Sequence, residues 1–290
     1  MGELLLAREH LEKAISLYDP ERHRSLAFNY GGVGAGVNCL SYVAMTLWQL
    51  GYPDQALKRG NEAVALAQTP LHLFGLVSAE YYVGVLHQFR GEARAAQETA
   101  ERVIAFCAEH GFPDYFAFAT TLRGWAMAEQ RLNEEGIAQI QEGLVGSGAT
   151  GSKLNRPYFQ CLLAQACRET GRLGDGLSAL TEALSTADEY EIRHYEPEMH
   201  RLKGELLLRQ DDPKVMEAQS CFERAIEIAR MQSAKSLELR ATMSLARLLA
   251  KQGRRDEACA MLTEIYGWFT EGFDTADLKD AKALLDELAG

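Results

Sequence analysis

LGYPDQALKRGNEAVALA, residues 50–67, decides the fold because its pattern returns five more times along the chain. Each copy is a turn followed by small and apolar residues at i, i+3, i+4 and i+7, the period of one helix face. The copies predict paired helices that repeat with a period near 40 residues. The small residues that anchor the six copies are Ala56, Ala96, Gly136, Gly176, Ala218 and Ala258.

A second small residue stands twelve residues before each anchor, or fourteen in the fifth copy. In tetratricopeptide repeats, small residues at these two places let the paired helices approach closely. No segment alternates apolar and polar residues as a strand would. We therefore expect an all-α fold, a right-handed α-solenoid of about six helical hairpins. The second set comprises Ala44, Gly84, Gly124, Ala164, Gly204 and Ala246.

Glycine occupies the turn inside most hairpins, where a left-handed backbone ends the first helix. Arg131 holds this place in the third hairpin, so we expect a strained turn there. Prolines stand just ahead of several first helices, where the missing amide proton costs nothing. The turn glycines are Gly51, Gly91, Gly171 and Gly253, and the prolines are Pro70, Pro113, Pro157 and Pro197.

The pattern assigns residues 1–290 to one superhelical domain. Residues 1–20 match a second helix without a first, and residues 21–37 form the longest irregular stretch, which we expect to be mobile. Six hairpins occupy residues 38–275, and a capping helix occupies residues 276–290. Because an unpaired second helix at the N-terminus leaves an apolar face open, we expect the chain to be a C-terminal piece of a longer protein.

The segment YGWFTEGFDT, residues 266–275, gathers aromatic residues, glycines and carboxylates, a composition that is found in ligand loops. It precedes an apolar stripe at Leu278, Ala281, Leu284, Leu285 and Leu288, which predicts a helix that covers the last hairpin. We favour packing under this cap, and a ligand loop is the alternative.

The chain carries 41 acidic and 30 basic side chains, a formal charge of -11, which repels nucleic acids and anionic membranes. Its six cysteines include no Cys-x-x-Cys pair and suit reduced thiols of a cytoplasmic protein. No apolar run approaches the length of a membrane-spanning helix. We expect a cytoplasmic protein that binds neither nucleic acid nor membrane.

Two groups of residues invite a cofactor interpretation, and neither is convincing. GGVGAG, residues 31–36, lacks the preceding strand and the following Lys-Ser/Thr of a phosphate loop. His194, Glu196, Glu198 and His200 have metal-binding side chains, but they stand at a helix start, where carboxylates are favoured anyway. We predict no cofactor and no metal.

The first helices of such solenoids line a concave groove, and their repeat positions select the candidate binding residues. The groove changes from aromatic to charged along the chain and suits a peptide with an apolar end and an acidic end. The alternative is that the aromatic residues merely pack between neighbouring first helices. The candidates are Trp48, Tyr81, Phe118, Trp125, Tyr158, Arg168, Glu198, Arg201, Glu205, Arg240 and Arg247.

Four segments carry a resemblance to a known architecture: GYPDQAL (51–57), HRLKGELLL (200–208), SLELRATMSLARL (236–248) and YGWFTEGFDTADLKDAKALLDEL (266–288). They resemble the C-terminal tetratricopeptide region of bacterial signalling proteins that join a class III adenylate or guanylate cyclase, or a kinase, to an AAA-like STAND ATPase. The resemblance implies a regulatory role, with catalysis upstream of this chain.

Two functions remain open from the sequence. The first is a non-catalytic regulatory or scaffold module that binds a protein or a peptide, including other domains of the parent protein. The second is a small-molecule effector sensor, which an enclosed pocket around the aromatic residues would favour over an open groove. The sequence leaves the oligomeric state open.

Overall fold

The computed structural model describes residues 2–23, 34–68 and 73–290, and in these ranges the regular structure is α-helical. Most of the predicted mobile junction, including the first glycines of GGVGAG, lies outside the described residues, as does Pro70. Contacts along the chain group it into two compact units. The N-terminal unit is Glu3–Trp48 with Tyr52–Gly151, and the C-terminal unit is Ser152–Gly290 with Met1–Gly2 and Gln49–Gly51.

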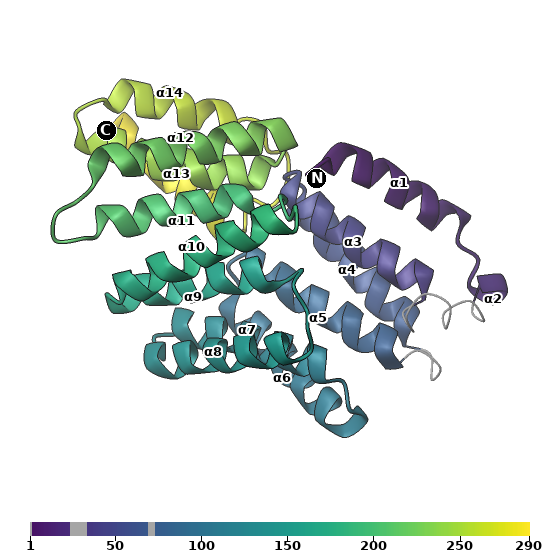
Figure 1. Ribbon diagram of the computed structural model, residues 1–290. Helices are drawn as coiled ribbons and strands as arrows, with labels where there is room; N and C mark the ends of the chain where they lie inside the picture. The colour runs from purple at the N-terminus through teal and green to yellow at the C-terminus, as the bar shows by residue number, and fades with distance from the viewer. Residues whose placement is uncertain (1, 24–33, 69–72) are drawn as a thin grey trace. The chain divides into compact units, whose positions relative to one another are not determined.

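The N-terminal unit begins with the predicted extra helix and continues as three hairpins (Figure 1). Ile15 of the extra helix packs on a small apolar core that includes Leu40 and Ala63. Arg59 also holds the same helix through a 2.8 Å ion pair with Glu12. The helices are α1 (Leu4–Leu17), α2 (Pro20–His23), α3 (Ala35–Gln49), α4 (Pro53–Ala67), α5 (Leu73–Phe89), α6 (Ala93–His110), α7 (Pro113–Glu129) and α8 (Asn133–Ala149).

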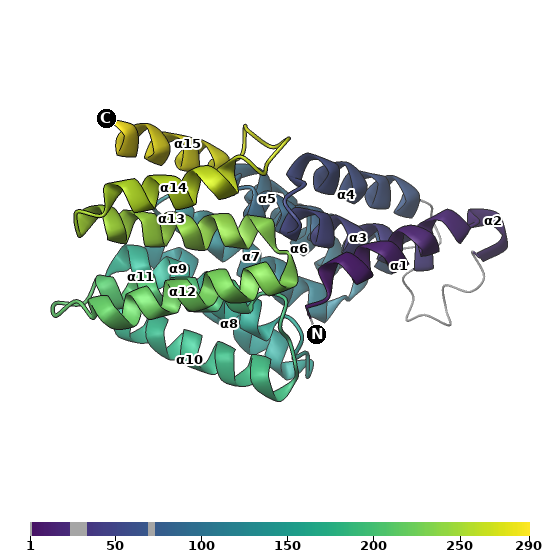
Figure 2. The ribbon, with the colours of Figure 1, turned by 90° about the horizontal axis from the view of Figure 1, so that it is seen from above.

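The C-terminal unit contains three further hairpins and a last helix, which lies beside α13 and α14 (Figure 2). Each hairpin contacts the next, so the first helices α9, α11 and α13 are neighbours. The helices are α9 (Arg156–Thr170), α10 (Leu173–Glu189), α11 (Glu196–Leu208), α12 (Val215–Gln232), α13 (Lys235–Lys251), α14 (Arg255–Tyr266) and α15 (Ala276–Ala289). The predicted all-α solenoid of helical hairpins is thereby confirmed.

The hairpin turns use the left-handed backbone that the sequence predicted. Gly91, Gly171 and Gly253 have φ angles of 76°, 74° and 82°. Arg131 adopts the same conformation, with φ of 69°, although a side chain is strained there. The third hairpin therefore keeps the turn geometry of the others and tolerates the strain.

Close approach of α7 and α8 explains the small residues of the repeat. A Cβ atom added to Gly124 would lie 2.6 Å from the carbonyl oxygen of Gly136. A Cβ atom added to Gly136 would lie 2.6 Å from the carbonyl oxygen of Gly124. These distances leave no room for a methyl group, so the two glycines set the spacing of the hairpin.

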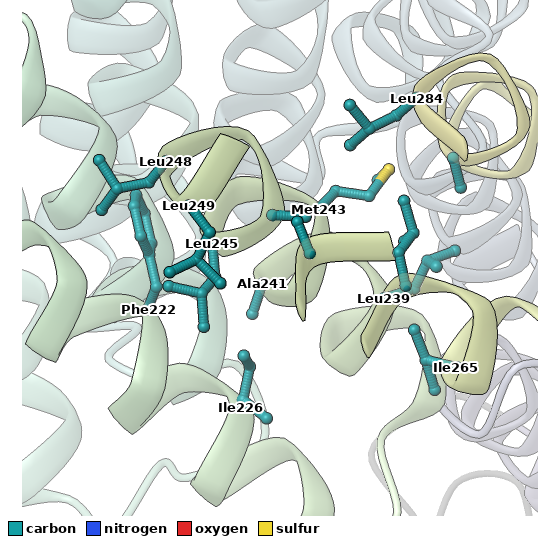
Figure 3. Close-up of a cluster of buried hydrophobic side chains, with 14 of the residues drawn as sticks. Phe222, Ile226, Leu239, Ala241, Met243, Leu245, Leu248, Leu249, Ile265 and Leu284 are labelled. Carbon is teal, nitrogen blue, oxygen red and sulfur yellow. The ribbon is translucent and has the colours of Figure 1, made fainter. Parts of the chain in front are cut away.

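The last helix covers an apolar core that α12, α13, α14 and α15 build together (Figure 3). Leu278, Ala281, Leu284 and Leu288 of α15 are buried in it and Leu285 packs against it half-buried, which confirms the predicted capping stripe. Phe269 is buried in the same core, and Tyr266 and Trp268 pack against it. Phe273, by contrast, is half exposed. Most of the aromatic cluster before α15 is thus packing under the cap.

Candidate functional site

Four of the candidate binding residues lie in the N-terminal unit, and all four are buried: Trp48, Tyr81, Phe118 and Trp125. The Trp48 ring stacks on Phe89 of α5, with 4.1 Å between the ring centroids. The Tyr81 ring lies 5.6 Å from the Phe118 ring, between α5 and α7. Trp48, Tyr81 and Phe118 therefore make the contacts between neighbouring first helices that the sequence offered as the alternative to a groove.

Tyr115 of α7 belongs to this aromatic cluster, although the repeat positions did not select it. Its ring lies 5.7 Å from Tyr81 and 5.6 Å from Phe118, and its hydroxyl donates a 2.8 Å hydrogen bond to Ser78. Burial raises the pKa of Tyr115 to about 12, so the phenol stays neutral. Tyr115 lies three residues before Phe118, a spacing that places both on one helix face, and this spacing could have identified Tyr115 from the sequence.

In the C-terminal unit, Arg201 of α11 is the centre of a charged network. Its guanidinium group donates two 2.7 Å hydrogen bonds to the Glu198 carboxylate and another to Glu205. Ser244 of α13 donates a 2.9 Å hydrogen bond to the same Glu205 carboxylate. Glu198 is only 1% exposed and Arg201 9%, so these charges are largely removed from water.

Two further arginines extend the network to the neighbouring first helices. Arg168 of α9 donates a hydrogen bond to Glu205. Arg240 of α13 donates a 2.8 Å hydrogen bond to Asp277 of α15, and its guanidinium lies 3.7 Å from Glu198. Side chains from α9, α11, α13 and α15 therefore meet on one side of the C-terminal unit.

The pairing decides the ionisation of these groups. Burial alone would raise the pKa of Glu205, but the guanidinium groups of Arg201 and Arg168 outweigh it and lower the pKa to about 2. Burial likewise opposes ionisation of Glu198, yet Arg201 holds the pKa of that carboxyl below its usual value. Burial lowers and the carboxylates raise the pKa of Arg201, with a net rise. Arg201, Glu198 and Glu205 are therefore ionised at neutral pH, whereas burial raises the pKa of Asp277 above its usual value despite the nearby Arg240.

The structure brings five of the candidate binding residues into this network and leaves two apart. The Tyr158 ring meets the Tyr195 ring edge to face at 5.5 Å between centroids. Arg247 is exposed on α13. The five residues of the network are Arg168, Glu198, Arg201, Glu205 and Arg240.

The repeat positions missed one carboxylate that completes the network. Asp277 lies on the capping helix, outside the six counted hairpins. Asp277 follows its partner Arg240 by 37 residues, the same separation as between Arg168 and Glu205. Extending the repeat register by one more helix would therefore have identified Asp277 from the sequence.

The histidines and carboxylates near the start of α11 do not form a shared site. Glu196 lies 3.8 Å from His200, while the carboxylate of Glu198 accepts hydrogen bonds from Arg201 instead. Burial lowers the pKa of His200. Among the residues that the structure describes, no three His, Cys, Asp or Glu side chains are placed to hold one metal ion.

A comparison with protein-family models finds no match. The chain is 24% identical over 260 residues to the uncharacterized protein R02095 of Rhizobium meliloti (strain 1021). That alignment covers 88% of this chain and 25% of the relative, so the chain spans about a quarter of the relative's length.

Solved structures of helical-repeat proteins share the fold. A Rap protein complexed with Competence and Sporulation Factor gives a TM-score of 0.65 at 13% identity, covering 99% of this chain and 80% of the Rap chain. Aspartyl phosphate phosphatase F from Bacillus subtilis gives 0.56 at 10% identity, covering 83% and 61%. Yeast Tom70 gives 0.56 at 13% identity, covering 97% and 59%. At these identities the likeness concerns the fold alone.

None of the helices in the described ranges has both the length and the apolar character that crossing a membrane requires.

Proposed function

We propose that this chain is a non-catalytic regulatory module that binds a protein or a peptide through its first helices. The proposal rests on one observation: polar side chains from successive repeats connect α9, α11, α13 and α15 by hydrogen bonds. A surface built from several helices can recognise an extended segment at several points, and aromatic and arginine side chains are frequent anchors of such recognition. The structure of a Rap protein with Competence and Sporulation Factor supports this use of the fold.

The module belongs, in this proposal, to a larger bacterial signalling protein. The chain aligns with only 25% of the length of a relative, which supports a place within a larger protein. The sequence resemblance suggests a STAND ATPase and a nucleotide cyclase as the domains that it controls. We expect the natural full-length protein to cyclise a nucleotide, and removal of the segment corresponding to residues 1–290 to change that rate. An unchanged rate would argue against control by this module.

Capture of proteins from a lysate of the native cells, with the chain immobilised, identifies candidate partners. Binding of each purified candidate is then measured by calorimetry for the intact chain and for Tyr158→Ala. Tyr158 is a predicted binding residue that is 8% exposed, so we expect this change to weaken partner binding.

Phe222→Ala is the matched control, because Phe222 is buried on the second helix α12 and its loss also destabilises the unit. Equal loss of affinity in the two variants would attribute the effect to instability and count against the site. Binding of a metabolite instead of any protein, detected by a thermal shift, would favour the effector-sensing function.

A further inference from the structure

The charged network has no excess of positive charge that would attract an acidic partner. Three arginines face four carboxylates across α9, α11, α13 and α15, because Arg168 also pairs with Glu169 at 2.8 Å. The pairs are Arg168 with Glu205, Arg201 with Glu198 and Glu205, and Arg240 with Asp277 and Glu198. Because each cation already has a carboxylate partner, an anionic ligand would have to compete with buried internal ion pairs.

One helical turn beyond this network, the side chains become basic. Glu205 of α11 and Ser244 of α13 contact each other at 2.9 Å. Arg209 follows Glu205 by four residues, and Arg247 follows Ser244 by three, so both continue the same helix faces. Lys251 stands four residues after Arg247. Neighbouring first helices therefore present a basic end, defined by Arg209, Arg247 and Lys251.

These cations remain accessible. Arg247 and Lys251 are exposed, and in the described part of the chain no carboxylate lies within 4.0 Å of either. Arg209 is 48% exposed; it donates a 2.9 Å hydrogen bond to the carbonyl of Arg168 and lies 3.6 Å from Glu169. The negative end of the α13 dipole stabilises Lys251, but Arg247 lies a full turn earlier.

We propose that this basic end binds an acidic segment of the protein partner, an inference that rests on the proposed function. The chain as a whole has a net charge of -11 and repels anions, so an acidic segment is attracted only where basic side chains are exposed together. Guanidinium groups bind carboxylates in a bidentate, directional manner. A short run of Asp or Glu suits this small surface, whereas a long nucleic acid would extend over the acidic remainder of the chain.

The test is fluorescence anisotropy of a labelled oligo-glutamate peptide with the full chain. Arg247→Gln/Lys251→Gln removes two exposed charges from the basic end. Lys279→Gln/Lys282→Gln, on α15, removes the same charge from two exposed lysines elsewhere and is the matched control. We expect the first variant to raise the Kd by about tenfold, the second to leave it unchanged, and added salt to weaken binding to the intact chain.

Three results would overturn the inference: no binding of the peptide, equal weakening in both variants, or equally tight binding of single-stranded DNA of the same charge. Binding measurements with the purified partner distinguish a failure of this inference from a failure of the proposed function. If Tyr158→Ala weakens partner binding while Arg247→Gln/Lys251→Gln does not, the proposed function stands and the basic end is not its acidic-segment site. If the intact chain binds no partner at all, the proposed function itself fails.

Discussion

Arg201 and Glu198, three residues apart on α11, form a two-point ion pair in which both hydrogen bonds measure 2.7 Å. The carboxylate is almost wholly buried, and the guanidinium group also reaches Glu205. A buried pair of this kind adds little stability relative to apolar residues, but removal of one member leaves an uncompensated charge in the interior. The pair therefore makes α11 sensitive to any change that separates the two charges.

Replacement of the central arginine tests that sensitivity. We expect Arg201→Leu to lower the free energy of unfolding by about 3–5 kcal/mol, because Glu198 and Glu205 lose their shared partner. Urea denaturation followed by circular dichroism measures the change. Arg94→Leu is the control: its ion pair with Glu98 is exposed, and its loss should change stability by less than about 0.5 kcal/mol. Similar effects in both variants would contradict this account of the network.

Acid should destabilise the protein through the same carboxylates. The pKa of Glu205 is about 2 in the folded chain, below its ordinary value of 4.5, so folding favours the ionised form. The resulting stabilisation, about 3 kcal/mol, is present above pH 4.5 and disappears as the pH falls toward 2. Urea midpoints measured across this range should fall with pH, and less steeply in Glu205→Gln. A parallel decline in the variant would show that other groups are responsible.

The close approach of α7 and α8 predicts a steric effect of a single methyl group. Gly136→Ala should destabilise the chain by about 3 kcal/mol, because the new Cβ atom would lie 2.6 Å from the Gly124 carbonyl oxygen. Gly174→Ala, on α10, is the control: no atom lies within 4 Å of its added Cβ, and alanine favours helix by up to about 1 kcal/mol. Thermal unfolding distinguishes the two. A neutral Gly136→Ala would show that the hairpin can open without penalty.

The strained turn of the third hairpin predicts a stabilising replacement. Arg131→Gly should raise the free energy of unfolding by about 1 kcal/mol, since glycine adopts φ of 69° without the clash of a Cβ atom. The reverse change, Gly253→Arg, meets no neighbouring atom within 4 Å but introduces the same strain at φ of 82°. It should destabilise by a similar amount. Changes of the same sign in both variants would argue against backbone strain as the cause.

The repeat spacing predicted the hairpins, their turn glycines and the capping helix, because each depends on residues close together in sequence. Gly124 and Gly136, for instance, are separated only by one turn and parts of two helices. The candidate site was harder to predict. The register placed Arg168, Arg201 and Arg240 on one side of the C-terminal unit, but it could not show that Asp277 of the capping helix would pair with one of them.

The sequence by itself determined that this chain folds as helical hairpins, because helix period and side-chain size act over short separations and leave little choice of packing. Only the tertiary structure decided which charges neutralise one another. An ion pair depends on distances of about 3 Å between side chains some 40 residues apart in the chain, as with Arg240 and Asp277. Arg247 and Lys251 of the first helix α13 stay outside that pairing. Both are exposed, and in the described residues no carboxylate lies within 4.0 Å of either.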